Sequence, residues 1–210
     1  MNQDTIAAIS TGMTNSGIGI VRISGSEALE IADRVYKGKE TITEVPTHTI
    51  HYGHVMDGDE TVDEVLVMVM RGPRTFTGED TVEINCHGGT YVVSRVLETV
   101  LKAGARPAEP GEFTKRAFLN GKMDLSQAEA VIDVITSENE YALQSSISQL
   151  KGSVKNRIKE IREKIIYHTA FIETALDDPE HISVDGYGKT LKKVVDEIIE
   201  AMKRLLDSCD

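Results

Sequence analysis

A carboxylate in the middle of a predicted strand is the first candidate for chemistry in this sequence. Apolar and polar residues alternate over 81–86, and the apolar members are Val82, Ile84 and Cys86. Because strand side chains alternate between the two faces, Glu83 points away from these three residues. Gly88 and Gly89 then end the strand, and a helix pattern follows at Tyr91.

Such a junction favours ligand binding, because glycines allow close approach of the backbone and a helix start offers free N–H groups. The alternative interpretation is a solvated Glu83 beside an ordinary turn, since carboxylates are mostly exposed.

Arg22 is a second candidate, on a strand predicted within 17–25. It shares a face with Ile18 and Ile20, so its apolar stem is expected to lie on the sheet while its head reaches water or a carboxylate. Its planar guanidinium equally suits gripping an anion or stacking on a ring, and both interpretations stay open. Gly17 and Gly19 precede this strand rather than follow it, which excludes a dinucleotide-binding fingerprint.

Basic residues gather further along the chain. Asn120 and Gly121 predict a turn that places Lys122 on a loop, close in sequence to Lys115 and Arg116. These charges would make a small anion pocket, although an exposed loop lysine is usually only solvated charge.

Composition limits the class of protein. The chain has 210 residues, 40% hydrophobic and 27% charged, and a net charge of -11, which argues against a broad nucleic-acid-binding surface. The spacing of His48, His51 and His54, and of Cys86 and Cys209, predicts no metal site, and both thiols are expected to be reduced. No apolar run reaches the length of a membrane span and the N-terminus resembles no secretory signal, so we expect a cytoplasmic protein without a membrane partner.

Hydrophobic periodicity predicts an α+β region first. Capping-box spacing at 24–27 predicts a helix to Tyr36, a hairpin is expected from strands 49–56 and 62–70, and a helix, a short strand and a short helix follow at 91–103, 105–109 and 110–118.

Helical stripes dominate the rest of the chain. A second capping box at 126–129 starts a stripe that runs on to Leu150, and two more helices follow at 158–176 and 191–205. We therefore expect an α+β domain at 1–119 and the first part of an all-helical domain at 120–210.

Five sequence motifs stand in order along the chain: Gly19–Gly25, Phe76–Asp80, Cys86–Gly89, Ala108–Leu125 and Gln127–Ala130. Through these motifs the whole chain resembles the MnmE (TrmE) family of tRNA modification GTPases. The motif at Ala108–Leu125 is the most specific of the five.

The resemblance implies an N-terminal domain similar to folate-dependent one-carbon proteins. In the family this domain binds a tetrahydrofolate derivative, either 5-formyl- or 5,10-methylene-tetrahydrofolate, and forms a homodimer. The folate-binding positions carry over onto Arg22, Glu83 and Lys122, with Thr77, Gly78 and Arg116 as second-tier members of the pocket, and no catalytic residue is assigned.

The chemistry of these side chains agrees with that ligand. A carboxylate on Glu83 would accept both the ring N–H and the exocyclic amine of a reduced pterin, a bidentate and charge-assisted pairing. Arg22 and Lys122 suit the carboxylates of the glutamate tail or polar atoms of the ring, and their division of these roles stays open.

The resemblance also implies a reaction at carbon 5 of the wobble uridine of tRNA, shared with the flavin-using partner MnmG (GidA). A GTP-binding domain that uses magnesium and potassium is inserted into the family's helical domain. This sequence contains no Gly-x-x-x-x-Gly-Lys-Ser/Thr phosphate loop, and Cys209 does not match the family's C-terminal cysteine motif. We therefore expect an N-terminal fragment that neither binds nor hydrolyses GTP.

Two other hypotheses stay open. One is a stand-alone folate-dependent aminomethyltransferase, for which Glu79, Asp80 and His87 are the only nearby acids or bases. The other is a structural dimer scaffold that has lost its ligand.

Overall fold

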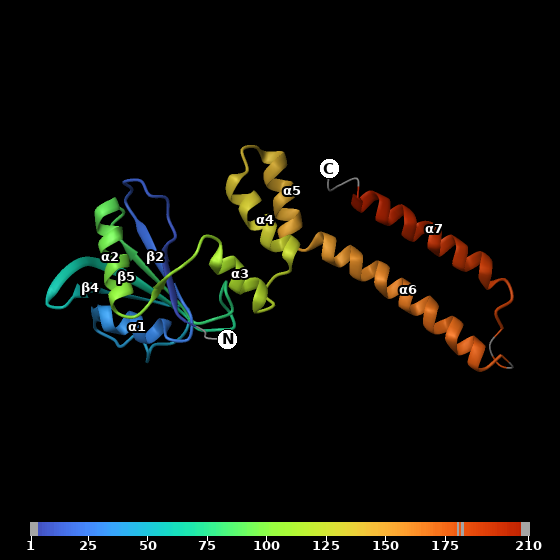
Figure 1. Cartoon of the computed structure of the whole chain (residues 1–210), viewed down its shortest axis with the longest axis horizontal. Coiled ribbons are helices and arrows are strands. Elements are labelled where there is room, and N and C mark those ends of the chain that lie inside the picture. The colour runs from blue at the N-terminus through green and yellow to red at the C-terminus, as the bar shows by residue number, and fades with distance from the viewer. Residues whose placement is uncertain (1–3, 180, 182, 207–210) are drawn as a thin grey trace. The chain divides into compact units, whose positions relative to one another are not determined.

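The computed structural model describes residues 4–179, 181 and 183–206 (Figure 1). The chain divides into two compact units, Met1–Met123 and Asp124–Asp210.

The first unit is built on a seven-stranded sheet with the strand order β3-β4-β5-β6-β2-β1-β7. Neighbouring strands are antiparallel except for β1 and β7, which are parallel. The strands are β1 (Ile6–Ile9), β2 (Gly19–Ser24), β3 (Tyr36–Gly38), β4 (Thr49–Asp57), β5 (Glu60–Met70), β6 (Thr81–Cys86) and β7 (Arg106–Pro107).

Two helices, α1 (Ala28–Val35) and α2 (Thr90–Lys102), pack on one face of this sheet (Figure 1). The strand residues beneath them are branched aliphatics that water does not reach, because alternation turns every second side chain towards the helices. The fully buried members of this core include Val21, Ile23, Val55, Val67, Val69, Val82 and Ile84. A third helix, α3 (Glu112–Leu119), follows β7 in the chain.

The opposite face of the sheet carries apolar side chains that stay exposed. Tyr52, Leu66, Asn85 and Ile20 lie side by side in one row across β4, β5, β6 and β2. Tyr52 is 58% exposed and Leu66 is 48% exposed. Hydrophobic patches of this kind mark interaction surfaces in many proteins.

The second unit contains α4 (Leu125–Thr136), α5 (Glu140–Leu150), α6 (Ser153–Asp177) and α7 (Tyr187–Leu206). Within it α4 packs on α5, and α6 contacts α7. None of the helices in the described part of the chain combines the length and the apolarity that crossing a bilayer requires.

The expected single helix up to Leu150 is wrong, because the chain breaks at Ser137. That residue has an extended backbone (φ -60°, ψ 123°), and α5 restarts with Asn139, whose side chain accepts a hydrogen bond from the Ala142 N–H. Asparagine competes with the helix for backbone hydrogen bonds, which explains why an unbroken apolar stripe does not guarantee an unbroken helix.

Both predicted capping boxes are also wrong in detail. The N-cap of α1 is Glu27 and makes no side-chain cap bond, while Ser24 belongs to β2 and points into the protein. The N-cap of α4 is Asp124, which forms a reciprocal capping box with Gln127. The three-residue spacing is met by several overlapping pairs, and the backbone of the preceding loop decides among them.

The remaining short elements differ slightly from expectation. The strand expected at 105–109 is reduced to the two residues of β7, beside β1. A three-residue strand, β3, lies within the connection after α1, where the sequence showed no strand pattern. Both lie at the edges of the sheet, where pairing with a neighbour rather than local propensity defines a strand.

Candidate functional site

Arg22 and Glu83 lie directly opposite each other on β2 and β6. Arg22 Nε donates a hydrogen bond to Glu83 Oε1 at 2.7 Å, and the side chains are 28% and 15% exposed. On its other side Glu83 is opposite Met68 of β5. The register of the sheet thus places a largely dehydrated ion pair on the face away from α1 and α2, which distinguishes Glu83 from an ordinary solvated carboxylate.

Two aromatic rings lie beside the Arg22 guanidinium. Its Cζ atom is 5.8 Å from the ring centre of Phe76 and 5.5 Å from that of Phe113, which comes from α3. Both distances are within the range of cation–π attraction. Arg22 therefore pairs with a carboxylate and also stacks beside rings, so the two interpretations of this residue apply together.

Lys122 lies beside the loop between β5 and β6. Its Nζ donates a hydrogen bond to the Pro73 carbonyl at 2.8 Å. Its stem lies along Gly78, where an added Cβ would meet Lys122 Cγ at 3.3 Å. Gly78 has φ 82°, a left-handed conformation that favours glycine, so both the backbone and the space select this residue.

A hollow of about 350 Å³ lies next to Lys122. The residues that line it are Ser26, Pro73, Gly78, Glu79, Asp80, Asn120 and Lys122. Arg22 and Glu83 are not among them. The structure therefore forms two adjacent groups, the Arg22–Glu83 pair and the Lys122 hollow, which are joined by the loop segment 76–78.

Thr77 turns its side chain inward rather than towards either group. It is fully buried, and its Oγ1 lies 2.8 Å from Ser24 Oγ. Its carbonyl accepts a hydrogen bond from Asn120 Nδ2 at 2.8 Å. Thr77 thus fixes the loop segment, and its backbone rather than its hydroxyl faces the end of α3.

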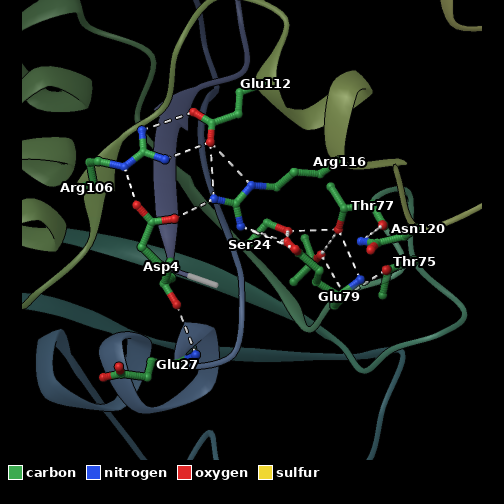
Figure 2. Close-up of polar contacts among 12 residues, drawn as sticks. Asp4, Ser24, Glu27, Thr75, Thr77, Glu79, Arg106, Glu112, Arg116 and Asn120 are labelled. Carbon is green, nitrogen blue, oxygen red and sulfur yellow. Dashed lines mark hydrogen bonds and ion pairs between the residues drawn. The ribbon is translucent and has the colours of Figure 1, made fainter. Parts of the chain in front are cut away.

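Arg116 is surrounded by carboxylates (Figure 2). Its guanidinium lies 3.0 Å from Asp4, 3.2 Å from Glu79 and 3.1 Å from Glu112. Arg106 adds a second cation, 2.6 Å from Asp4 and 2.7 Å from Glu112. We call these five residues the Arg116 cluster.

The arginines of the cluster favour the ionised forms of Glu112 and Asp4. Hydrogen bonds from Arg106, supported by a backbone N–H at Glu109 and by Arg116, lower the pKa of the Glu112 carboxyl to about 2. Arg106 likewise lowers the pKa of Asp4. The donors of Arg116 are accordingly directed at protein carboxylates in this structure.

A second hollow, also about 350 Å³, lies on the open face of the sheet beside Leu66, Asn85 and His87. His87 Nδ1 lies 2.8 Å from Asp63, whose hydrogen bond raises the pKa of the imidazole. Burial raises the pKa of the neighbouring Cys86 thiol to about 11, so this cysteine stays protonated and is a poor nucleophile near pH 7. Cys209 lies outside the described residues.

The acids proposed for a transferase are engaged by the protein. Glu79 accepts from Ser24 and Arg116, and Asp80 accepts from the Gly72 N–H at 2.8 Å. His87 lies at the far end of β6 from Thr81 and pairs with Asp63. These contacts give the transferase hypothesis no support beyond its sequence.

Sequence reasoning did not single out Phe76, Phe113 or Ser24. Both aromatic residues stand inside the motifs that carry the family resemblance, which was the available signal. Ser24 gave a misleading signal, because its spacing to Glu27 matches that of a helix capping box.

The fold and the site together define a class: an α+β domain with an ion pair on its open sheet face, followed by a helical domain. Family models of the same two parts match this chain, the N-terminus of the GTP-binding protein TrmE over residues 5–122 and the MnmE helical domain over residues 125–210. The chain belongs to the TrmE (MnmE) family, which confirms the resemblance and the expected fold class.

Individual relatives agree with the family models. The chain is 56% identical over 208 residues to the tRNA modification GTPase MnmE of Lachnoclostridium phytofermentans, an alignment of 98% of this chain and 45% of that protein. It is 51% identical to the protein of the same name from Carboxydothermus hydrogenoformans, over 99% of this chain and 46% of that protein. The chain therefore spans a little under half the length of these relatives.

Proposed function

We propose that this chain is the folate-binding and dimerising part of a tRNA-modifying GTPase, and that its site is centred on Arg22 and Glu83. The observation that carries the proposal is a partly buried carboxylate–guanidinium pair beside two aromatic rings. A tetrahydrofolate derivative has matching parts: a pterin with adjacent N–H donors, a benzoyl ring and an anionic tail.

In this proposal the pterin binds the Glu83 carboxylate. The hydrogen bond from Arg22 uses Oε1. Each carboxylate oxygen has two lone pairs, so Oε1 can accept from the ligand as well as from Arg22, and Oε2 accepts the second ligand donor. The remaining donors of the Arg22 guanidinium and Lys122 then serve the ligand's carboxylates or polar ring atoms, while Phe76 and Phe113 offer faces for stacking. The residues present therefore fit either proposed form, 5-formyl- or 5,10-methylene-tetrahydrofolate.

Calorimetric titration of the chain with 5-formyltetrahydrofolate tests the proposal. We expect binding by the wild-type chain and weaker binding by Glu83→Ala, with Glu64→Ala as the matched control. Glu64 belongs to β5 on the same open face and has no proposed ligand role. No binding by the wild-type chain would overturn the proposal that these residues form a complete folate site.

We also propose that the first unit forms the homodimer. The exposed apolar side chains of the open face, among them Ile50 and Leu66, support a surface that a second copy covers. Their exposure contrasts with the covered face of the same sheet, where the helices have already excluded water.

A further proposal concerns the activity of the full-length relatives. We infer participation in modifying carbon 5 of the wobble uridine of tRNA, in the cytoplasm and together with MnmG (GidA). We also infer that residues 1–210 do not themselves bind GTP, because their sequence contains no phosphate loop. Titration with a fluorescent GTP analogue in magnesium and potassium tests this inference, and saturable binding would contradict it.

A further inference from the structure

The Arg116 cluster lies behind the loop that joins the two parts of the proposed site. The side chains of Arg116, Glu79 and Glu112 are only 11%, 13% and 9% exposed. Figure 2 shows Arg116 reaching from α3 towards Glu79 on this loop, with Asp4 and Arg106 on its other side. A buried cation shared by three acids is a strong constraint on the segments that carry those acids.

Glu79 links the Arg116 cluster to the loop through hydrogen bonds. Its Oε2 accepts a hydrogen bond from Ser24 Oγ at 2.9 Å, and the same hydroxyl lies 2.8 Å from Thr77 Oγ1. The Glu79 N–H also donates to Thr77 Oγ1 at 3.2 Å, and its carbonyl accepts from Thr75 Oγ1 at 2.7 Å. Ser24 and Thr77 are fully buried, so the hydrogen bonds that fix Glu79 to the loop are shielded from solvent.

The residues fixed in this way are those that touch the proposed ligand residues. Phe76 precedes Thr77 and lies beside the Arg22 guanidinium. Gly78 follows Thr77 and lies against the stem of Lys122. The end of α3 is attached to the same segment through Asn120 and the Thr77 carbonyl.

We infer that Arg116 is a positioning residue rather than a ligand contact: through Glu79 it sets where Phe76 stands beside Arg22 and where Gly78 stands beside Lys122. This inference rests on the proposed folate site and assigns Arg116 a different part in it from that of a pocket-lining residue. According to this inference, Arg116 affects ligand binding only through the position of the loop.

The two arginines of the cluster allow a sharp test, because they differ in one partner. Among the described residues, the cation paired with Glu79 is Arg116, whereas Glu112 and Asp4 are each paired with both arginines. Arg116→Gln therefore leaves Glu79 dehydrated without a countercharge, whereas the matched control Arg106→Gln leaves every acid of the cluster with one cation.

The measurement is folate affinity of the intact chain, by calorimetry with 5-formyltetrahydrofolate. We expect Arg116→Gln to weaken binding by about tenfold or more and Arg106→Gln by less than about threefold, a tenfold change being the scale of one lost charged interaction. Adding Glu79→Gln to Arg116→Gln removes the unpaired charge and should restore at least about threefold of the loss. Equal losses for both arginine variants, or no loss for Arg116→Gln, would overturn the inference.

The double variant also separates positioning from direct contact. If Arg116 bound the ligand itself, neutralising Glu79 would restore nothing, because the missing donor would still be missing. An Arg116→Gln loss that Glu79→Gln leaves unchanged therefore also overturns the inference.

Amide hydrogen exchange of the unliganded chain tests the inference without a ligand. Exchange at 75–80 should rise in Arg116→Gln and stay near wild type in Arg106→Gln, and equal protection in both variants would overturn the proposed role. Failure of the wild-type chain to bind folate, with this exchange difference intact, would count against the folate site alone.

Discussion

The two units of this chain differ in how far they bury their large apolar side chains. In the first unit the sheet and two helices enclose a core that includes Val67, Ile84 and Val96, each fully buried. In the second, the buried apolar residues among those described are Ala130, Ala175 and Ile198, while large ones such as Ile165 and Leu206 remain 49% and 69% exposed. Helix periodicity is clear in both units, so a regular apolar stripe does not by itself mean that a helix buries it.

The ion pairs of the two units also differ in exposure, and the least exposed of those described lie in the first unit. The first unit contains ion pairs with little exposure that join segments far apart in sequence, such as Arg22–Glu83 and Arg116–Glu79. The pairs described in the second unit are exposed, both the local pair Lys159–Glu163 and the pair Lys164–Glu197 between α6 and α7. Exposed pairs contribute little to stability, and buried ones fix the geometry of their surroundings. The proposed binding chemistry accordingly lies in the unit whose side chains are held in place.

The largest expected effect concerns the core itself. Ile31→Ala in α1, where the side chain is 1% exposed, should lower the free energy of unfolding of the first unit by about 3 kcal/mol, because it leaves a cavity. The matched Ile165→Ala in α6 should cost less than about 1 kcal/mol, since that side chain is half exposed. Hydrogen exchange in each unit during urea unfolding measures the free energy of unfolding of both variants. Equal losses in Ile31→Ala and Ile165→Ala would contradict the contrast between the units.

The next effect concerns the ion pair of the site. Glu83→Ala should weaken binding of 5-formyltetrahydrofolate by about 2 kcal/mol or more, roughly 30-fold, because a charged acceptor is lost. Glu64→Ala on the same face should bind nearly as the wild type does. Unchanged affinity in Glu83→Ala, measured by calorimetry, would remove this residue from the site.

The open face of the sheet supplies the third prediction. Leu66→Glu should raise the dissociation constant of the dimer by about tenfold or more, because a charge would be buried at the interface. Ile165→Glu, an equally exposed apolar position in the second unit, should leave dimerisation unchanged. Sedimentation at micromolar concentration distinguishes them, and a dimer that only Ile165→Glu weakens would move the interface to the helical unit.

The smallest effect is a pH dependence of the first unit. The folded-state pKa of Glu112 is lowered from 4.5 to about 2, chiefly by Arg106, so its stabilisation is complete above about pH 4.5 and is lost as the pH falls towards 2. The loss should be about 1 kcal/mol, below the full linkage value because the pair partly meets water. Thermal unfolding of Arg106→Gln should show a flatter acid limb than the wild type, and identical limbs would contradict the assignment.

Much of the first unit follows from local sequence. The hairpin of β4 and β5 and the burial of Val82 and Ile84 agree with their alternation and turn residues, because these signals act within a few residues. The break at Ser137 and the edge strand β3 did not follow, since a cap or an edge contact overrode a weak local preference.

By itself the sequence determined the types and the order of the longer elements, apart from the break between α4 and α5, and the family to which the chain belongs. The tertiary structure alone decided what each candidate side chain meets. Arg22 and Glu83 are 61 residues apart, and Arg116 and Asp4 are 112 apart, yet each pair is in contact. Periodicity carries no information about such distances, because the register between strands and the docking of α3 are set by packing of the whole unit.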